Sequence, residues 1–175
     1  MRNAYAIIML SFLLFATAAV AADKTSTFTL PSGVKVTIVE VPFEKSLFKI
    51  EGCSDRDSVC RINGHAPFGV AFGLPKTYVK SITVSFKGRS NSLDASDMYN
   101  AWGSRPLEHP GSIRYFGGKC FDNGNCQLRG LFSDGAGTFV AEWAIVNGLS
   151  IRTVLTGSDD VVNLFMKNID PPEYE

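Results

Sequence analysis

The sequence lacks the motifs of the common catalytic and nucleotide-binding sites. It contains no G-x-S-x-G nucleophile elbow, no H-E-x-x-H zinc motif, no phosphate-binding P-loop and no G-x-G-x-x-G after a strand. Only two histidines, His65 and His109, offer side chains that titrate near neutral pH. Each neighbours a proline in loop-like sequence, which favours an exposed loop histidine. These absences predict a protein that is not an enzyme and that needs no cofactor or metal.

An excess of charge of one sign is also missing. The chain has 17 basic and 17 acidic residues, and they are scattered. A nucleic-acid binder normally presents a basic face, and a protein held at an anionic membrane surface presents a run of Lys and Arg. Because neither feature is present, we expect no nucleic-acid partner. No repeat, low-complexity block or linker divides the chain.

One long apolar segment stands at the start, in MRNAYAIIMLSFLLFATAAVAADK. An early arginine, an apolar stretch and a final Ala-Val-Ala are the layout of a secretory signal peptide. The alternative is an uncleaved membrane anchor, for which this run is short. We expect residues 1–22 to be cleaved and residues 23–175 to form one domain with no stable membrane insertion. The absence of an Asn-x-Ser/Thr sequon favours a bacterial periplasmic or secreted protein.

Four cysteines lie in two close pairs, Cys53 with Cys60 and Cys120 with Cys126. Cys-x-x-Cys, the usual redox spacing, is absent, and the intervals are wider than those of most zinc sites. Four thiolates around one metal remain an alternative. In an oxidising compartment we expect two disulfides. The chain-entropy model gives about 2–2.5 kcal/mol for each local pair and about 4–5 kcal/mol for a long-range Cys53–Cys126 bond, so energy does not decide the pairing. Proximity, and the Asn-Gly turn inside the second pair, favour local pairs.

Most of the remaining pattern is β. Residues 27–30 and 34–41 read as strands around a Pro-Ser-Gly turn, and in residues 80–87 apolar and polar side chains alternate. Residues 61–74, RINGHAPFGVAFGL, contain an apolar run that the pattern does not assign. From residue 112 onward, four β-rich runs separated by glycine-containing turns predict a meander. These runs are SIRYF, CQLRGLF, TFVAEWAIV and LSIRTVLT.

The Asn147-Gly148 dipeptide predicts a two-residue type I′ hairpin turn. That turn would set Val146 opposite Leu149, Ala144 opposite Ile151 and Trp143 opposite Arg152. The last pair has two interpretations. The indole and guanidinium form a cation–π contact of about 0.5–1 kcal/mol, or Trp143 packs into the core.

Two helices are expected. Asp94 has the features of an N-cap, with Asp97 three residues later and Leu93 and Met98 at the hydrophobic-staple positions, and Gly103 would end this short helix. The alternative is a turn-rich loop. At the end of the chain, Ser158-Asp159-Asp160 opens a helix that Pro171-Pro172 ends. The expected apolar stripe of that helix comprises Val161, Val162, Leu164, Phe165 and Ile169. The predicted fold class is α+β, mostly β: an antiparallel twisted sheet or meander with a short central helix, a C-terminal helix and two local disulfides.

Two sets of polar residues keep chemical alternatives open. His109 with Glu108 or Asp97, and Ser104 or Ser112, would make a small periplasmic hydrolase, although nothing in the spacing requires a triad. Asp55 and Asp57 in the first cysteine loop, with Asp122 in the second, are oxygen ligands of the kind that Ca²⁺ takes. Neither loop matches the twelve-residue calcium pattern.

The segment WGSRPLEHPGSIRYF, residues 102–116, is the candidate binding surface. Its prolines reduce the entropy lost on docking, and it contains Arg and aromatic residues, the usual interface anchors. The alternative is an ordinary surface connection. The candidate partner-binding residues are Arg105, Leu107, His109, Arg114 and Tyr115, with Asp55 and Arg56 in the first cysteine loop.

The order of these features resembles the invasion-associated locus B family of exported bacterial proteins. A close cysteine pair follows a strand in FKIEGCSDRDSVCRI, a second pair surrounds a glycine in CFDNGNC, and LTGSDDVVNLF closes the pattern. The chain departs from the family pattern in DASDMYNAW and LEHPG, and it has no Trp before the first cysteine. The resemblance implies a β-rich envelope domain with two disulfides, associated with host-cell entry rather than with a known reaction.

Together these observations predict a non-enzymatic, protein-binding module of the bacterial envelope. It would act as an inhibitor or immunity protein, or as a host-interaction factor. The alternatives are the hydrolase described above and a structural component of an envelope assembly, which would leave a large apolar surface uncovered.

Overall fold

The computed structural model describes residues 23–52, 59–102, 115–133 and 135–170, with only the backbone of Cys60. These residues form strands, two 3₁₀ turns and one α-helix. In chain order the elements are β1 (Lys24–Thr29), β2 (Lys35–Pro42), η1 (Lys45–Leu47), β3 (Ile50–Gly52), β4 (Val59–Ile62), β5 (Thr77–Phe86), β6 (Arg89–Leu93), β7 (Phe116–Cys120), β8 (Cys126–Phe132), η3 (Gly135–Gly137), β9 (Phe139–Val146), β10 (Leu149–Thr156) and α1 (Asp159–Lys167).

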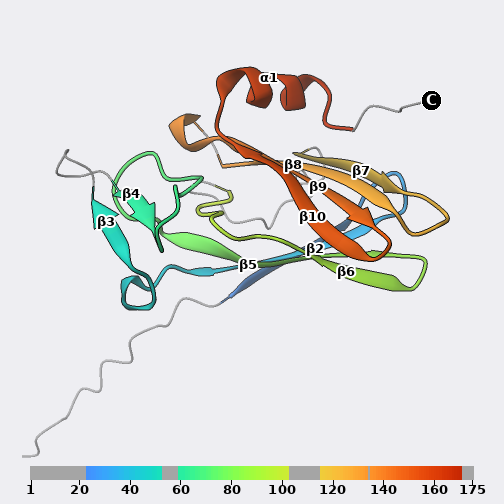
Figure 1. Cartoon of the computed structure of the whole chain (residues 1–175), viewed down its shortest axis with the longest axis horizontal. Coiled ribbons are helices and arrows are strands. Elements are labelled where there is room, and N and C mark those ends of the chain that lie inside the picture. The colour runs from blue at the N-terminus through green and yellow to red at the C-terminus, as the bar shows by residue number, and fades with distance from the viewer. Residues whose placement is uncertain (1–22, 53–58, 103–114, 134, 171–175) are drawn as a thin grey trace, which may run out of the picture.

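The strands form two four-stranded antiparallel sheets packed face to face (Figure 1). We call the sheet with strand order β1-β2-β5-β6 sheet A and the sheet with order β10-β9-β8-β7 sheet D. A two-stranded ladder of β3 and β4 lies at one end of the sandwich. The predicted antiparallel, mostly β fold is confirmed, and its strands divide between two sheets.

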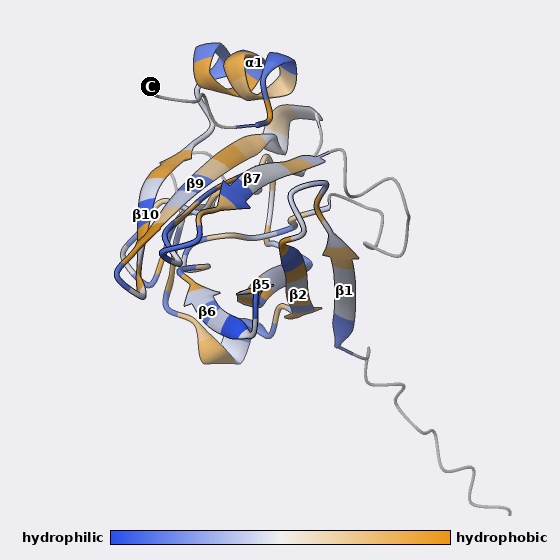
Figure 2. Cartoon of the chain, turned by 90° about the vertical axis from the view of Figure 1, so that its right-hand side faces the viewer, coloured by the Kyte–Doolittle hydropathy of each residue, from blue (hydrophilic) through white to orange (hydrophobic). Residues whose placement is uncertain are grey.

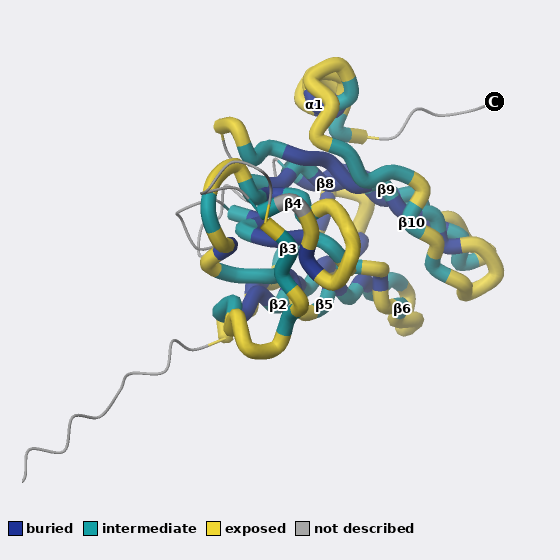
Figure 3. The backbone as a smooth tube through the Cα atoms, turned by 60° about the vertical axis from the view of Figure 1, so that its left-hand side comes forward, coloured by how far each residue is buried: buried dark blue, intermediate teal, exposed yellow. Residues whose placement is uncertain are grey.

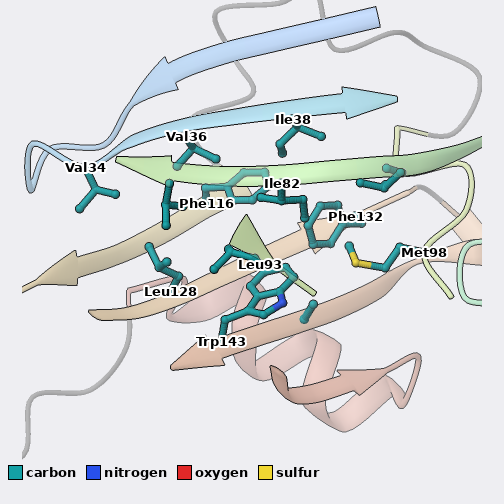
Figure 4. Packing of buried hydrophobic residues seen from close by; sticks show 14 of the residues in the cluster. Val34, Val36, Ile38, Ile82, Leu93, Met98, Phe116, Leu128, Phe132 and Trp143 are labelled. Carbon is teal, nitrogen blue, oxygen red and sulfur yellow. The ribbon is translucent and has the colours of Figure 1, made fainter. Parts of the chain in front are cut away.

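The core lies between the sheets because alternate side chains of each strand point inward. Figure 4 shows Val36, Ile38 and Ile82 of sheet A facing Leu128 and Trp143 of sheet D. Aromatic rings fill the space where the sheets meet loops. Phe132 stacks on Phe139 with ring centroids 5.1 Å apart.

The predicted C-terminal helix is confirmed, and α1 packs on the outer face of sheet D (Figure 2). Val162 and Phe165 are buried against Val140 of β9, while the rest of the helix is largely exposed (Figure 3). Arg129 of β8 lies over the Phe165 ring, with its Cζ 4.7 Å from the ring centroid. The helix ends at Lys167, and the predicted Pro-Pro stop lies outside the described residues. No helix in the described ranges combines the length and apolar character needed to cross a membrane.

The hairpin predictions are confirmed. Asn147 and Gly148 both have positive φ, 52° and 79°, as a type I′ turn requires. The strand register is the predicted one, with Val146 opposite Leu149 and Trp143 opposite Arg152. Trp143 belongs to the core, where it is 1% exposed and its indole N–H donates to the Asp94 carbonyl at 2.8 Å.

The local disulfide between Cys120 and Cys126 is confirmed. The two residues face each other across the β7–β8 hairpin, and their sulfurs are bonded. The other predicted pair, Cys53 with Cys60, lies outside the described side chains.

The predicted central helix is wrong. Residues 94–102 form turns and isolated bridges instead. The carboxylate of Asp94 does accept a hydrogen bond from the Ser96 N–H at 2.9 Å, but it closes a turn rather than a helix. Asp97 then adopts a positive φ of 64°, which no helix allows. Met98 and Tyr99 are buried and pair with Phe68 and Tyr78, so long-range pairing overrides the local capping signal.

Candidate functional site

Most of the residues predicted to bind a partner lie outside the described part of the chain. Tyr115 is the one that the structure describes. It is partly buried, packs against the core, and its ring centroid lies 6.3 Å from that of Trp102. The residues outside the described ranges are Arg105, Leu107, His109, Arg114, Asp55 and Arg56, together with Asp57, Ser104, Glu108 and Ser112 of the alternatives.

An apolar loop between β4 and β5 is the most exposed apolar feature of the described chain. Residues 69–75 read GVAFGLP and contain no polar side chain; we call them the Phe72 loop. The Phe72 side chain is 81% exposed and Leu74 is 43% exposed, whereas Gly69 and Pro75 at the two ends are buried. The loop therefore presents apolar side chains to water from a buried base.

Asn100 holds both ends of the Phe72 loop. Its side-chain amide donates to the Gly69 carbonyl at 3.0 Å, and its amide oxygen accepts from the backbone N–H groups of Lys76 at 2.8 Å and Thr77 at 3.2 Å. One side chain thus satisfies backbone groups before and after the loop. The spacing between the two ends of the loop is fixed by these bonds.

The base of the loop also packs closely on the backbone. Gly69 has a φ of 89°, and a Cβ at this position would lie 1.8 Å from the Tyr99 carbonyl oxygen. Only glycine allows that approach. Next to it, Phe68 pairs with residues 97–99 through backbone hydrogen bonds. The Phe72 loop is therefore anchored on residues 97–100, which the sequence had suggested to be helical.

A polar cluster lies on the same segment. His65 Nδ1 lies 3.1 Å from both carboxylate oxygens of Asp97. Arg152 of β10 also reaches this cluster. Its Nη1 donates to the Ser96 carbonyl at 2.5 Å, and its Nη2 lies 3.3 Å from Asp94 Oδ2. Three segments distant in sequence meet here, and the Asp97 carboxylate contacts His65. His109, the histidine of the predicted triad, lies outside the described residues.

Asp94 and Arg152 form a structural ion pair in this cluster. Burial alone would raise the pKa of Asp94, but hydrogen bonds from Ser96 and the charge of Arg152 outweigh it and lower the pKa below its ordinary value. The Ser96 hydroxyl donates to Asp94 at 2.6 Å, so it is engaged with a carboxylate rather than with the histidine. The cluster therefore orients His65 without assembling a nucleophile and base.

The calcium alternative is not supported at Asp122. Its carboxylate pairs with Lys87 Nζ at 2.6 Å, and that contact lowers the pKa of Asp122. No group of three His, Cys, Asp or Glu side chains in the described ranges is placed to hold a metal ion.

A second apolar surface lies at the hairpin tips of sheet D. Phe121, Val146, Leu149 and Ile151 are 43%, 45%, 70% and 55% exposed. The register places Val146 opposite Leu149 on the outer face, beyond the part that α1 covers. We call these four residues the tip patch.

A cavity of about 10 Å³ lies between the β5–β6 and β7–β8 hairpins. Val84 and the Cys120–Cys126 disulfide are among the residues that line it. The cavity has room for one water molecule but not for a substrate.

Sequence reasoning did not identify the Phe72 loop as an exposed apolar element. The available signal was the unbroken apolar run bounded by Gly69 and Pro75, a composition unusual for a surface loop.

Comparison of the chain with protein-family models, with curated proteins and with solved structures found no match in any of the three.

Proposed function

We propose that this protein is a non-enzymatic binding protein that inserts the Phe72 loop into an apolar cleft of another protein. The observation that carries the proposal is the 81% exposure of Phe72 on a loop without a polar side chain. Burying a phenylalanine side chain stabilises a complex by about 1.5–3 kcal/mol. Aromatic side chains that fill a partner's pocket are typical binding hot spots.

The anchoring of the loop supports the same interpretation. The Asn100 hydrogen bonds fix both ends of the loop before any partner arrives. A loop that is already ordered loses little conformational entropy on binding. An inhibitor, an immunity protein or a host-interaction factor acts in this steric way, by filling a cleft.

Export to the bacterial periplasm or beyond belongs to the same proposal. The Cys120–Cys126 disulfide supports it, because disulfides form and persist mainly in oxidising compartments. The signal-peptide pattern at the start of the sequence supports it independently. The partner contacts predicted from sequence between Arg105 and Tyr115 belong to the same proposal.

The test is partner capture followed by measured affinity. The exported wild-type protein is used to capture partners from periplasmic extract, and each captured protein is then purified and titrated by calorimetry. Phe72→Ser is expected to weaken binding about 30-fold or more, the loss of a hot spot of about 2 kcal/mol. The matched control is Leu149→Ser, which removes another highly exposed apolar side chain, 70% exposed, from the tip patch and should bind like wild type.

Two results would overturn the proposal. The first is wild-type affinity in Phe72→Ser. The second is loss of binding in Leu149→Ser with Phe72→Ser unaffected, which would move the interface to the tip patch.

A further inference from the structure

The outer face of sheet A is composed almost entirely of hydroxyl side chains. Inward-pointing residues of its strands, such as Val36, Ile38 and Val84, are buried in the core, so the alternate residues point outward. Nine of the eleven outward positions are serine or threonine; we call this surface the hydroxyl face. Its residues are Thr25, Thr27 and Thr29 of β1, Lys35, Thr37 and Val39 of β2, Ser81, Thr83 and Ser85 of β5, and Ser90 and Ser92 of β6.

The strand register aligns these hydroxyls in rows across the sheet. Thr27 lies opposite Thr37, Thr37 opposite Thr83, and Thr83 opposite Ser92. This row crosses all four strands, with about 4.8 Å between neighbouring strands. Neighbouring hydroxyls are close enough to orient one another, because the Thr27 and Thr37 oxygens are 3.1 Å apart. The Ser85 hydroxyl likewise donates to Ser90 at 3.2 Å.

The hydroxyl face is open in the described structure. Figures 1 and 2 show α1 on the opposite side of the sandwich, over sheet D, and no labelled element against the outside of sheet A. Lys35 is the one charged residue among the eleven positions, and no aromatic side chain is present. The face therefore offers hydrogen bonds over a broad area with little charge and little apolar surface.

We propose that the hydroxyl face binds a linear, uncharged polysaccharide. Each Ser or Thr hydroxyl donates one hydrogen bond and accepts up to two, which matches the hydroxyl groups of a sugar ring. A polysaccharide repeats those groups along its length, as the rows repeat them across the sheet. A chain lying along the row from Thr27 to Ser92 meets a hydroxyl on every strand.

The chemistry of the face argues against a protein occupant. Protein interfaces concentrate aromatic residues, Met and Arg at their centre, and this face has none of them. Among the eleven positions, a charged ligand would find one charged side chain, Lys35. Because one hydrogen bond contributes little net free energy in water, many must form in parallel. This requirement selects a polymer over a single sugar.

The test is co-sedimentation of the full exported protein with insoluble polysaccharides. The probes are chitin and cellulose, which are linear, uncharged and insoluble. The wild-type protein should sediment with at least one of them. The triple variant Thr27→Val, Thr37→Val, Thr83→Val should bind that probe about tenfold more weakly, because three hydroxyls are lost. Valine keeps the shape of threonine and suits a strand, so the fold should be retained, as circular dichroism would verify.

Two further variants test whether the hydroxyl groups themselves bind the polysaccharide and whether this binding is independent of the Phe72 loop. The matched triple serine variant keeps the hydroxyls and should bind like wild type. Phe72→Ser should also bind the polysaccharide like wild type, so failure of the Phe72 loop as a protein-binding element leaves this result unaffected. The proposal is overturned if wild type sediments with none of the probes, if the valine variant binds as well as wild type, or if the folded serine variant loses binding.

Discussion

Among single residues, Glu40 departs most from the usual composition of a protein core. It continues the inward-facing series of β2 after Val36 and Ile38, and its side chain is only 5% exposed. Its carboxylate accepts hydrogen bonds from the Thr77 hydroxyl and from the backbone N–H of Ala101. Burial raises the pKa of Glu40, and these hydrogen bonds only partly oppose that rise. The ionised form is therefore less stable in the folded protein than in the unfolded chain.

The raised pKa of Glu40 determines the direction in which this residue makes stability depend on pH. A carboxyl group whose pKa is raised on folding contributes stability that is fully present below its unfolded value, 4.5 here, and is lost as the pH rises through the folded pKa. Replacing Glu40→Gln removes that dependence. The free energy of unfolding of wild type minus that of Glu40→Gln should therefore fall as the pH rises above 4.5 toward neutrality.

Denaturant titrations of both proteins across this pH range would measure the difference. The variant Glu44→Gln, at an exposed position two residues beyond β2, corrects for the change in net charge. A difference between wild type and Glu40→Gln that does not change with pH would contradict the interpretation. Wild-type stability alone would not decide it, because carboxylates with lowered pKa, such as Asp94 and Asp122, act in the opposite direction.

At the scale of elements, the base of the Phe72 loop requires glycine at position 69, and Gly64 provides a matched comparison. Gly69 and Gly64 have nearly equal positive φ, 89° and 86°. A Cβ at Gly69 would meet the Tyr99 carbonyl oxygen at 1.8 Å, whereas at Gly64 nothing lies within 4 Å. Gly64→Ala should lower the free energy of unfolding by about 1–2 kcal/mol from backbone strain alone. Gly69→Ala should lower it by about 3 kcal/mol or more, because backbone atoms must also move.

Urea denaturation of the two alanine variants beside wild type would test this expectation. Equal losses of stability would show that the loop base can shift without cost, and that residues 69–75 are not anchored as described.

The elements that could be predicted from sequence are those with strong local signals. Asn147-Gly148 fixes a hairpin whatever lies around it, and Asp159 and Asp160 mark the start of α1 by charge. The signal at Asp94 was equally local and gave the wrong element. There the same side-chain hydrogen bond closes a turn, and the pairing of the buried Met98 and Tyr99 with the distant Phe68 and Tyr78 decides the outcome.

Local sequence patterns could not predict the candidate site for a related reason. An unbroken apolar run such as residues 69–75 fits a buried strand as well as an exposed loop. What distinguishes them is Asn100, some thirty residues later in the chain, which takes the hydrogen bonds of both loop ends. The hydroxyl face could not be predicted from sequence for a similar reason. Alternating threonines and serines are visible in each strand, but only the pairing of four strands places them in one surface.

At the scale of the whole molecule, the sandwich requires contacts that join its two sheets at their edges. The edge strand β10 of sheet D lies beside β6 of sheet A, and Arg152 connects them. Its side chain is 14% exposed and bonds the Ser96 carbonyl and the Asp94 carboxylate, just beyond the end of β6. Trp143 donates to the Asp94 carbonyl at the same place. One short segment thus receives hydrogen bonds from two strands of the opposite sheet.

Arg152→Met should therefore destabilise the whole fold rather than one loop. The substitution keeps an apolar stem but leaves the Ser96 carbonyl and the Asp94 carboxylate without their cationic donor. A hydrogen bond to a charged group contributes about 1.5–3 kcal/mol, so we expect a loss of about 2–3 kcal/mol in the free energy of unfolding. Lys80→Met is the control, because Lys80 and Asp23 are 57% and 54% exposed and 3.5 Å apart. Removing such a surface pair should cost less than about 1 kcal/mol.

If Arg152 joins the sheets, the loss must appear as one cooperative transition seen by every probe. Tryptophan fluorescence reports the core, because Trp143 is buried in it and Trp102 packs against it, and far-ultraviolet circular dichroism reports the strands. Coincident transitions at lower denaturant concentration are expected for Arg152→Met. Separate transitions would mean that the two sheets unfold independently. A loss no larger than that of Lys80→Met would mean that the apolar core alone holds them together.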